Sequence, residues 1–209
     1  MPTEIVSIDP AHPEKAFARC REVIRSGGVI AYPTDTFYGL GADPRNPAAV
    51  GKLFSVKGRQ ADQPILLLIQ DSGAVRDWAA DVTPAADDLM ERFWPGPLTL
   101  VFKALPDVLP ELTANTGTIG LRVPGAGVTR DLLRFLDSAL TGTSANVSRR
   151  PSPRTAEEAA AALGDQVDLI LDGGPTPGGK PSTIVDMGCA VPRIIREGTV
   201  PLKDILGRR

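Results

Sequence analysis

Apolar residues recur along the chain with two different spacings. Helical spacing, preceded by residues that start helices, predicts helices over residues 47–54, 84–93 and 129–136. A further helix is predicted from Pro13 to the glycines at 27–28, and an alanine-rich one follows Thr155, which heads a capping box. Short continuous apolar runs predict strands at 29–32, 65–69, 98–102, 118–123, 167–171, 183–185 and 193–195.

The order of these segments indicates the fold class. Strands and helices mix over the whole chain without strict alternation and without an internal repeat. We therefore expect an α/β fold, α+β by some schemes, in which helices flank one twisted sheet with parallel and antiparallel pairs. No linker-like stretch divides the sequence, so residues 1–209 are expected to form a single domain. The Pro/Gly-rich segment 173–181 is expected to be a functional or covering loop.

Composition narrows the classes of function. Hydrophobic residues make up 42% and charged residues 23%, which is typical of a folded domain. No apolar run is long enough to cross a bilayer, and Met1–Pro10 lack the pattern of a secretory signal, so we expect a cytoplasmic protein without membrane contact. The net charge of −2 argues against a general nucleic-acid binder, so an anion site requires local clustering of Lys and Arg.

The supply of nucleophiles and metal ligands is small. Two cysteines and the single histidine, His12, cannot form a Cys/His zinc site, and no other histidine is available for a Ser-His-Asp system. Residues 174–181 nearly match a phosphate-binding P-loop. However, Pro181 stands where the magnesium-binding hydroxyl belongs, and a strand follows instead of a helix. The sequence therefore predicts no metal site.

Several short polar segments are candidates for an anion site. Lys57 and Arg59 are expected in one loop at a sheet end, pointing the same way, where they could hold a polyphosphate or lie exposed on the surface. Residues 141–148 form a run of hydroxyls and one amide that could bind phosphate or a nucleobase, or form a plain turn. Arg122 lies inside an apolar strand and requires a partner, either a substrate carboxylate or an acidic side chain of the protein.

Taken in order, these segments resemble the YrdC-like family of L-threonylcarbamoyladenylate synthases. The resemblance covers about Ala16 to Arg196 and is carried by six ordered motifs, at residues 32–41, 57–59, 94–99, 121–124, 144–148 and 182–186. It implies a mixed sheet with a concave, positive cleft. It also implies the formation of threonylcarbamoyl-AMP and pyrophosphate from L-threonine, bicarbonate and ATP, for a partner transferase that modifies tRNA.

The resemblance also assigns roles to residues. It implies that Lys57 and Arg59 neutralise the phosphates as the catalytic cations, with Mg²⁺ carried by the nucleotide. Such a transfer depends on positioning and charge neutralisation and requires no histidine or cysteine. The rest of the ATP site would be Gln63, Thr118, Ser144, Asn146, Ser152 and Arg196, and the threonine site Thr36, Arg122, Gly142 and Ser182.

Two positions depart from the family pattern. Leu68 stands in the buried strand where the family often has a histidine near the amino acid, and Gln63 stands where asparagine is common. Both leave the phosphate-neutralising groups in place, but Leu68 removes a polar contact to the amino acid. Two alternatives therefore stay open: a relative that acts on another amino acid or carbamoyl compound, and a non-catalytic RNA-binding module. Weak RNA binding, the oligomeric state and closure of a lid over residues 173–180 are also left open.

Overall fold

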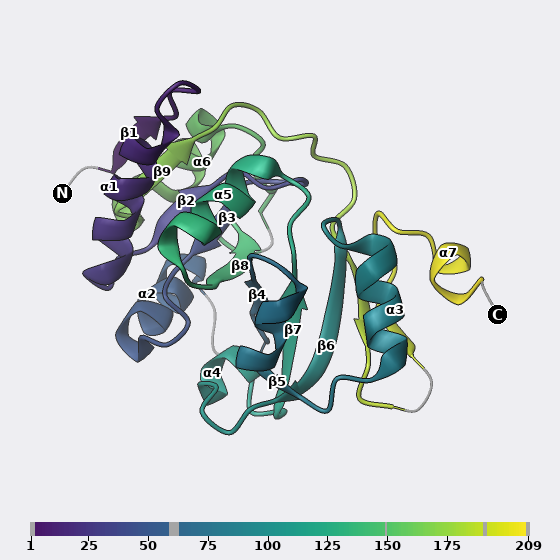
Figure 1. Ribbon diagram of the computed structural model, residues 1–209. Coiled ribbons are helices and arrows are strands. Elements are labelled where there is room, and N and C mark those ends of the chain that lie inside the picture. The colour runs from purple at the N-terminus through teal and green to yellow at the C-terminus, as the bar shows by residue number, and fades with distance from the viewer. Residues whose placement is uncertain (1–2, 59–62, 149, 190–191, 208–209) are drawn as a thin grey trace.

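A computed structural model describes residues 3–58, 63–148, 150–189 and 192–207, and one mixed sheet runs through it (Figure 1). Its strands are β1 (Glu4–Ser7), β2 (Ile30–Tyr32), β3 (Gly39–Gly41), β4 (Leu66–Leu68), β5 (Ala79–Ala80), β6 (Leu98–Ala104), β7 (Thr118–Arg122), β8 (Leu140–Ser144), β9 (Leu169–Asp172), β10 (Thr183–Asp186) and β11 (Arg193–Arg196). They lie in the order β1-β9-β2-β3-β8-β4-β7-β6-β10-β11, and β5 pairs with the edge of β6.

Parallel and antiparallel pairs are both present, as predicted. Strand β9 is parallel to β1 and β2, β4 is parallel to β7, and β6 is parallel to β10. The pairs β2–β3, β3–β8, β8–β4, β7–β6 and β10–β11 are antiparallel. Neighbours in the sheet therefore come from distant parts of the sequence, which brings the polar segments after different strands close together.

Helices cover both faces of the sheet. They are α1 (Pro13–Arg25), α2 (Pro47–Lys57), α3 (Pro84–Phe93), α4 (Pro110–Thr113), α5 (Gly127–Leu136), α6 (Ala156–Leu163) and α7 (Leu202–Leu206), with 3₁₀ turns at Ser72–Asp77 and Gly164–Gln166. Helices α1 and α5 contact each other and share one buried cluster with Leu68. Leu67 belongs to a second cluster, which includes residues of α2, α3, α4 and α6. The strand expected to be buried on both faces therefore has a core on each side, because successive side chains alternate.

Helix α2 corrects the expected position of Lys57. Asn46 starts the helix by accepting hydrogen bonds from the backbone N–H groups of Ala48 and Ala49, at 3.0 and 3.2 Å. The helix runs one turn further than expected and ends at Gly58, which has a φ of 58°. Lys57 is thus the last helical residue, so the expectation that it lies in an extended loop was wrong. Arg59 itself lies outside the described residues.

Strand β3 was not predicted, and strand β8 extends into the segment 141–148, which the sequence left open as a binding segment or a turn. Strand β3 contains Gly39 and Gly41, and β8 covers Leu140–Ser144, so half of the hydroxyl-rich segment is paired sheet. A Cβ on Gly41 would lie only 2.7 Å from Cε1 of Tyr32, so β3 needs glycine where the tyrosine ring crosses it. Glycine is depleted in β-strands, so this glycine-containing segment gave no sequence signal for a strand. Strands β1 and β5, helices α4 and α7 and the 3₁₀ turns were also not anticipated.

None of the helices in the described ranges combines the length and apolarity that a bilayer crossing requires.

Candidate active site

A cleft of about 1310 Å³ lies over the middle of the sheet. Its floor consists of alternate residues of neighbouring strands, namely Leu66 and Leu68 of β4, Thr118, Gly120 and Arg122 of β7, Gly142 and Ser144 of β8, and Thr99 and Val101 of β6. This period of two places all of them on one face of the sheet. The strand alternation that fills the core on the opposite face therefore also builds the floor of the cleft.

Two glycines on the floor of the cleft, Gly120 and Gly142, lie where a side chain would clash with neighbouring residues. A Cβ on Gly142 would lie 2.6 Å from Cδ1 of Leu66 and 3.1 Å from Cγ of Leu68. A Cβ on Gly120 would lie 3.2 Å from Cβ of Leu66 and 3.3 Å from Cγ2 of Thr99. Strands β8 and β7 thus present only backbone at these points, and the leucines between them fill the space beside them.

Lys57 points into the polar loop that follows β8. Its Nζ donates to the backbone oxygen of Ser144 at 2.6 Å, to Oδ1 of Asn146 at 3.0 Å and to Oγ of Ser144 at 3.3 Å. The residue is only 2% exposed, although it lines the cleft. Helix α2 and the 144–148 loop therefore place a buried ammonium group at the cleft wall.

The loop around Asn146 is ordered by its own hydrogen bonds. Oγ of Ser144 donates to Oδ1 of Asn146 at 2.5 Å, and Nδ2 of Asn146 donates to the backbone oxygen of Arg150. The backbone N–H of Ser148 donates to the carbonyl oxygen of Lys57 at 3.1 Å. This network holds the lysine and the loop in one arrangement, which is the preorganisation that an anion site requires.

Arg122 has an acidic partner within the chain. Its Nη2 pairs with Oδ1 of Asp35, and its Nε donates to the backbone oxygen of Gly96 at 3.0 Å. Of the two partners that the sequence left open for Arg122, an acidic side chain of the protein is therefore present. The arginine still lines the cleft, and its Nη1 has no hydrogen bond to a described residue.

Arg196 and Ser182 close one side of the cleft. Nη2 and Nε of Arg196 donate to the backbone oxygen of Ser182 at 2.9 and 3.3 Å. Oγ of Ser182 lies 2.9 Å from Oγ1 of Thr99. Partial burial and, next in size, the positive charge of Arg122 lower the pKa of Arg196. The two arginines thus act on each other through space, which makes this part of the cleft attractive to anions.

The cleft collects all the described residues that the sequence singled out for ATP and threonine. They come from strands β7, β8 and β11, helix α2 and the intervening loops, and are Thr36, Lys57, Gln63, Thr118, Arg122, Gly142, Ser144, Asn146, Ser152, Ser182 and Arg196. Arg59 is the remaining predicted site residue and falls outside the described ranges. The sequence missed the support given by Asp35, Gly96 and Thr99, because none of these residues has a partner near it in the chain.

The segment 173–180 crosses to the cleft and is tethered there. The backbone N–H of Gly178 donates to the carbonyl oxygen of Thr36 at 2.7 Å, and the Tyr38 hydroxyl donates to the carbonyl oxygen of Gly174 at 2.8 Å. Gly179 and Pro181 line the cleft. The hypothesis that this segment is a lid stays a prediction.

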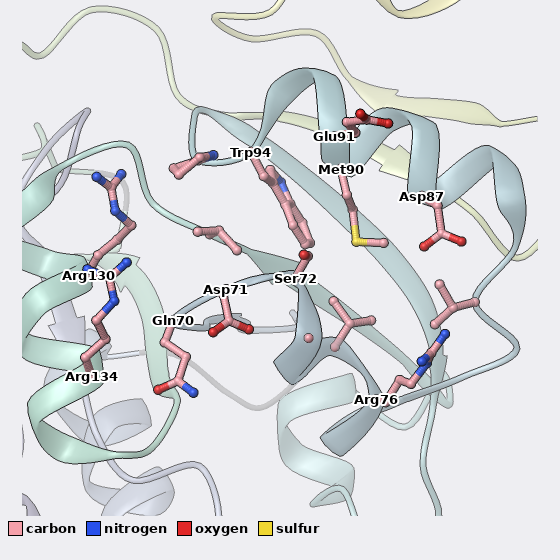
Figure 2. A pocket seen from close by; sticks show the side chains of 15 residues that line it. Gln70, Asp71, Ser72, Arg76, Asp87, Met90, Glu91, Trp94, Arg130 and Arg134 are labelled. Carbon is pink, nitrogen blue, oxygen red and sulfur yellow. The ribbon is translucent and has the colours of Figure 1, made fainter.

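A second pocket of about 500 Å³ lies between α3, α5 and the turn that begins at Ser72 (Figure 2). Trp94 and Met90 point into it, Arg130 and Arg134 lie on the α5 side, and Asp87 lies on the α3 side. Acidic and basic residues are both present, so its charge favours no single ligand class. None of the predicted ATP-site or threonine-site residues lines this pocket, although Trp94, Pro95 and Val123 of the ordered motifs do.

Comparison with known proteins places the chain in a family. The Sua5/YciO/YrdC family model, described as "Telomere recombination", matches residues 22–198. The threonylcarbamoyl-AMP synthase of Bacillus subtilis is 37% identical over 189 residues, which are 90% of this chain and 55% of that protein. A putative threonylcarbamoyl-AMP synthase of Mycobacterium tuberculosis is 36% identical over 197 residues, which are 94% of this chain and 90% of that protein.

A solved structure supports the same placement. The P. abyssi Sua5 crystal structure in complex with L-threonine superposes with a TM-score of 0.93 at 33% identity, over 98% of this chain and 61% of that one. The chain thus spans only a little over half the length of the Bacillus and P. abyssi proteins. With matches that cover nearly all of its residues, the chain belongs to the Sua5/YciO/YrdC family.

Proposed function

We propose that this chain is a cytosolic L-threonylcarbamoyl-AMP synthase, a nucleotidyltransferase that uses ATP, bicarbonate and L-threonine. The observation that carries the proposal is the buried Lys57 ammonium group, held on Ser144 and Asn146 in the same cleft as Arg122 and Arg196. Relatives named threonylcarbamoyl-AMP synthase and the threonine-bound P. abyssi structure support the choice of reaction.

The proposed chemistry has two steps. The threonine amine and bicarbonate first give a carbamate and water. A carbamate oxygen then attacks the α-phosphorus of ATP, and the bond from that phosphorus to the bridging oxygen breaks to release pyrophosphate. Catalysis of such a transfer depends on aligning the reactants and stabilising negative charge on the phosphate oxygens. A rigid cationic cleft supplies both.

Each part of the cleft has a role in this proposal. Lys57 and Arg59 neutralise the phosphates, and the nucleotide site is completed by Gln63, Thr118, Ser144, Asn146, Ser152 and Arg196. Mg²⁺ enters with ATP as part of the substrate. The described residues hold no cluster of three or more His, Cys, Asp or Glu side chains suited to a metal ion. The product serves a transferase that modifies tRNA.

The threonine site lies beside the nucleotide site. Arg122 binds the carboxylate through the part of its guanidinium that Asp35 and Gly96 leave unused, while Thr36, Gly142 and Ser182 border the amino acid. Leu68 pairs in register with Arg122 across β4 and β7 and lines the same floor. The apolar Leu68 side chain offers no hydrogen bond to a substrate hydroxyl, and this supports the second candidate, a synthase for another amino acid.

One assay separates these candidates. We expect pyrophosphate release that requires ATP and bicarbonate together, is fastest with L-threonine in a panel that includes serine, valine and isoleucine, and yields threonylcarbamoyl-AMP by mass spectrometry. A faster rate with another amino acid would favour the second candidate and assign the preference to Leu68. Absence of turnover with every amino acid, combined with salt-dependent RNA binding, would favour the RNA-binding module instead.

A further inference from the structure

Asp35 is a partly buried residue whose carboxylate has a single polar partner among the described residues. Its Oδ1 pairs with Nη2 of Arg122, and the two side chains are 16% and 6% exposed, respectively. Its Oδ2 is buried and has no hydrogen bond to a described residue. Asp35 does not itself line the cleft, although Thr34 and Thr36 on either side of it do. Its action on any substrate therefore passes through Arg122.

Fold stability alone does not explain this pair. Burying two charges costs desolvation energy that their attraction offsets only when the remaining polar atoms are also satisfied. One oxygen of Asp35 lacks such a partner. Replacing such a pair by apolar residues of similar size is often neutral or stabilising, so the main effect of the pair is the geometry that it imposes on the arginine.

The surrounding backbone is shaped to hold Asp35 in place. Oγ1 of Thr129 donates to the carbonyl oxygen of Pro33 at 2.5 Å, which fixes the turn that carries Asp35 to helix α5. A Cβ on Gly125 would lie 3.0 Å from Oδ2 of Asp35, so glycine leaves the room that the carboxylate occupies. Nη1 of Arg130 in turn donates to the carbonyl oxygen of Gly125 at 2.9 Å.

Two fixed contacts determine the plane of the Arg122 guanidinium. Gly96 holds Nε and Asp35 holds Nη2, which leaves Nη1 for a ligand in the cleft. We propose that Asp35 is a positioning residue that orients Arg122 for the carboxylate of the amino-acid substrate. This inference rests on the proposed function, which assigns that carboxylate to Arg122.

The test compares threonine and ATP kinetics in four variants. For Asp35→Ala we expect the threonine KM to rise about tenfold, within the range of couplings between contacting residues, while the ATP KM changes less than about twofold. Asp35→Asn should recover part of the loss, because its amide oxygen still accepts from Nη2. Gly125→Ala, which crowds the carboxylate, should raise the threonine KM in the same direction. Asp131→Asn, which breaks an exposed Asp–Arg pair on α5, is the matched control.

An unchanged threonine KM in Asp35→Ala, or equal shifts of both KM values, would overturn the positioning role. A second measurement does not depend on turnover. In ¹⁵N spectra, the Nη resonances of Arg122, assigned by their loss in Arg122→Lys, should be separate in the parent protein and averaged by rotation in Asp35→Ala. If the parent protein shows no threonine turnover, the proposed function fails, while identical Arg122 spectra in both proteins would refute the positioning role independently.

Discussion

Replacing Lys57 by Met tests the central element of the cleft. The change removes the ammonium group but keeps an unbranched side chain of similar length, so the packing at the end of α2 is retained. Lys57 is 2% exposed and already held at 2.6 Å from the backbone oxygen of Ser144. The ammonium group is therefore already held in position and needs little rearrangement when the phosphates of ATP bind.

The magnitude of the effect follows from this preorganisation. Removal of one preorganised donor from a site where charge develops costs about 2.7–4 kcal/mol, or about 10²–10³ in kcat. Two opposing effects act on stability. Acceptors on Ser144 and Asn146 lose their donor, at about 1–3 kcal/mol per buried group, while the cost of burying an ammonium group disappears. We therefore expect a large loss of rate with a small change in Tm.

The assay is pyrophosphate release in the presence of ATP, bicarbonate and threonine, with Tm measured on the same preparations. Lys52→Met is the matched control, because Lys52 lies on the same helix but pairs with Asp168 at the surface at 2.7 Å. Its rate should stay near that of the parent protein. A Lys57→Met variant that keeps its Tm and a rate within threefold of the parent would refute the phosphate-neutralising role.

Three further predictions address the floor, the thiols and a helix cap. Gly142→Ala should lower Tm and threonine affinity together, because the new Cβ would lie 2.6 Å from Leu66; calorimetry and binding would check this. Burial raises the pKa of Cys20 to about 12. Iodoacetamide at pH 8 should therefore modify the exposed Cys189 first, and the stability gained from the protonated Cys20 thiol should be lost between about pH 9 and 12. Thr155→Ala should cost about 1 kcal/mol in denaturant unfolding, because its side chain accepts from the N–H of Glu158 at 3.2 Å.

The sequence by itself determined most of the helices and strands. Strong periodicity and start signals, such as the Thr83 cap and the proline at the start of α3, act within one segment and can be read without the fold. The ordered polar motifs were equally local, and they identified the residues that line the cleft. Strand β3 escaped detection because its glycines are explained only by the Tyr32 ring that lies across them.

Tertiary structure decided how these residues act. The sequence left open whether Arg122 pairs with a substrate or with the protein, and the fold places Asp35, 87 positions earlier, against it. It also joins Lys57 of α2 to Ser144 at the end of β8 and to Asn146 beyond it, although these residues lie 87 and 89 positions apart in the chain. Local patterns carry no information about such long-range contacts, since the pairing of strands depends on which faces the whole chain can bury together.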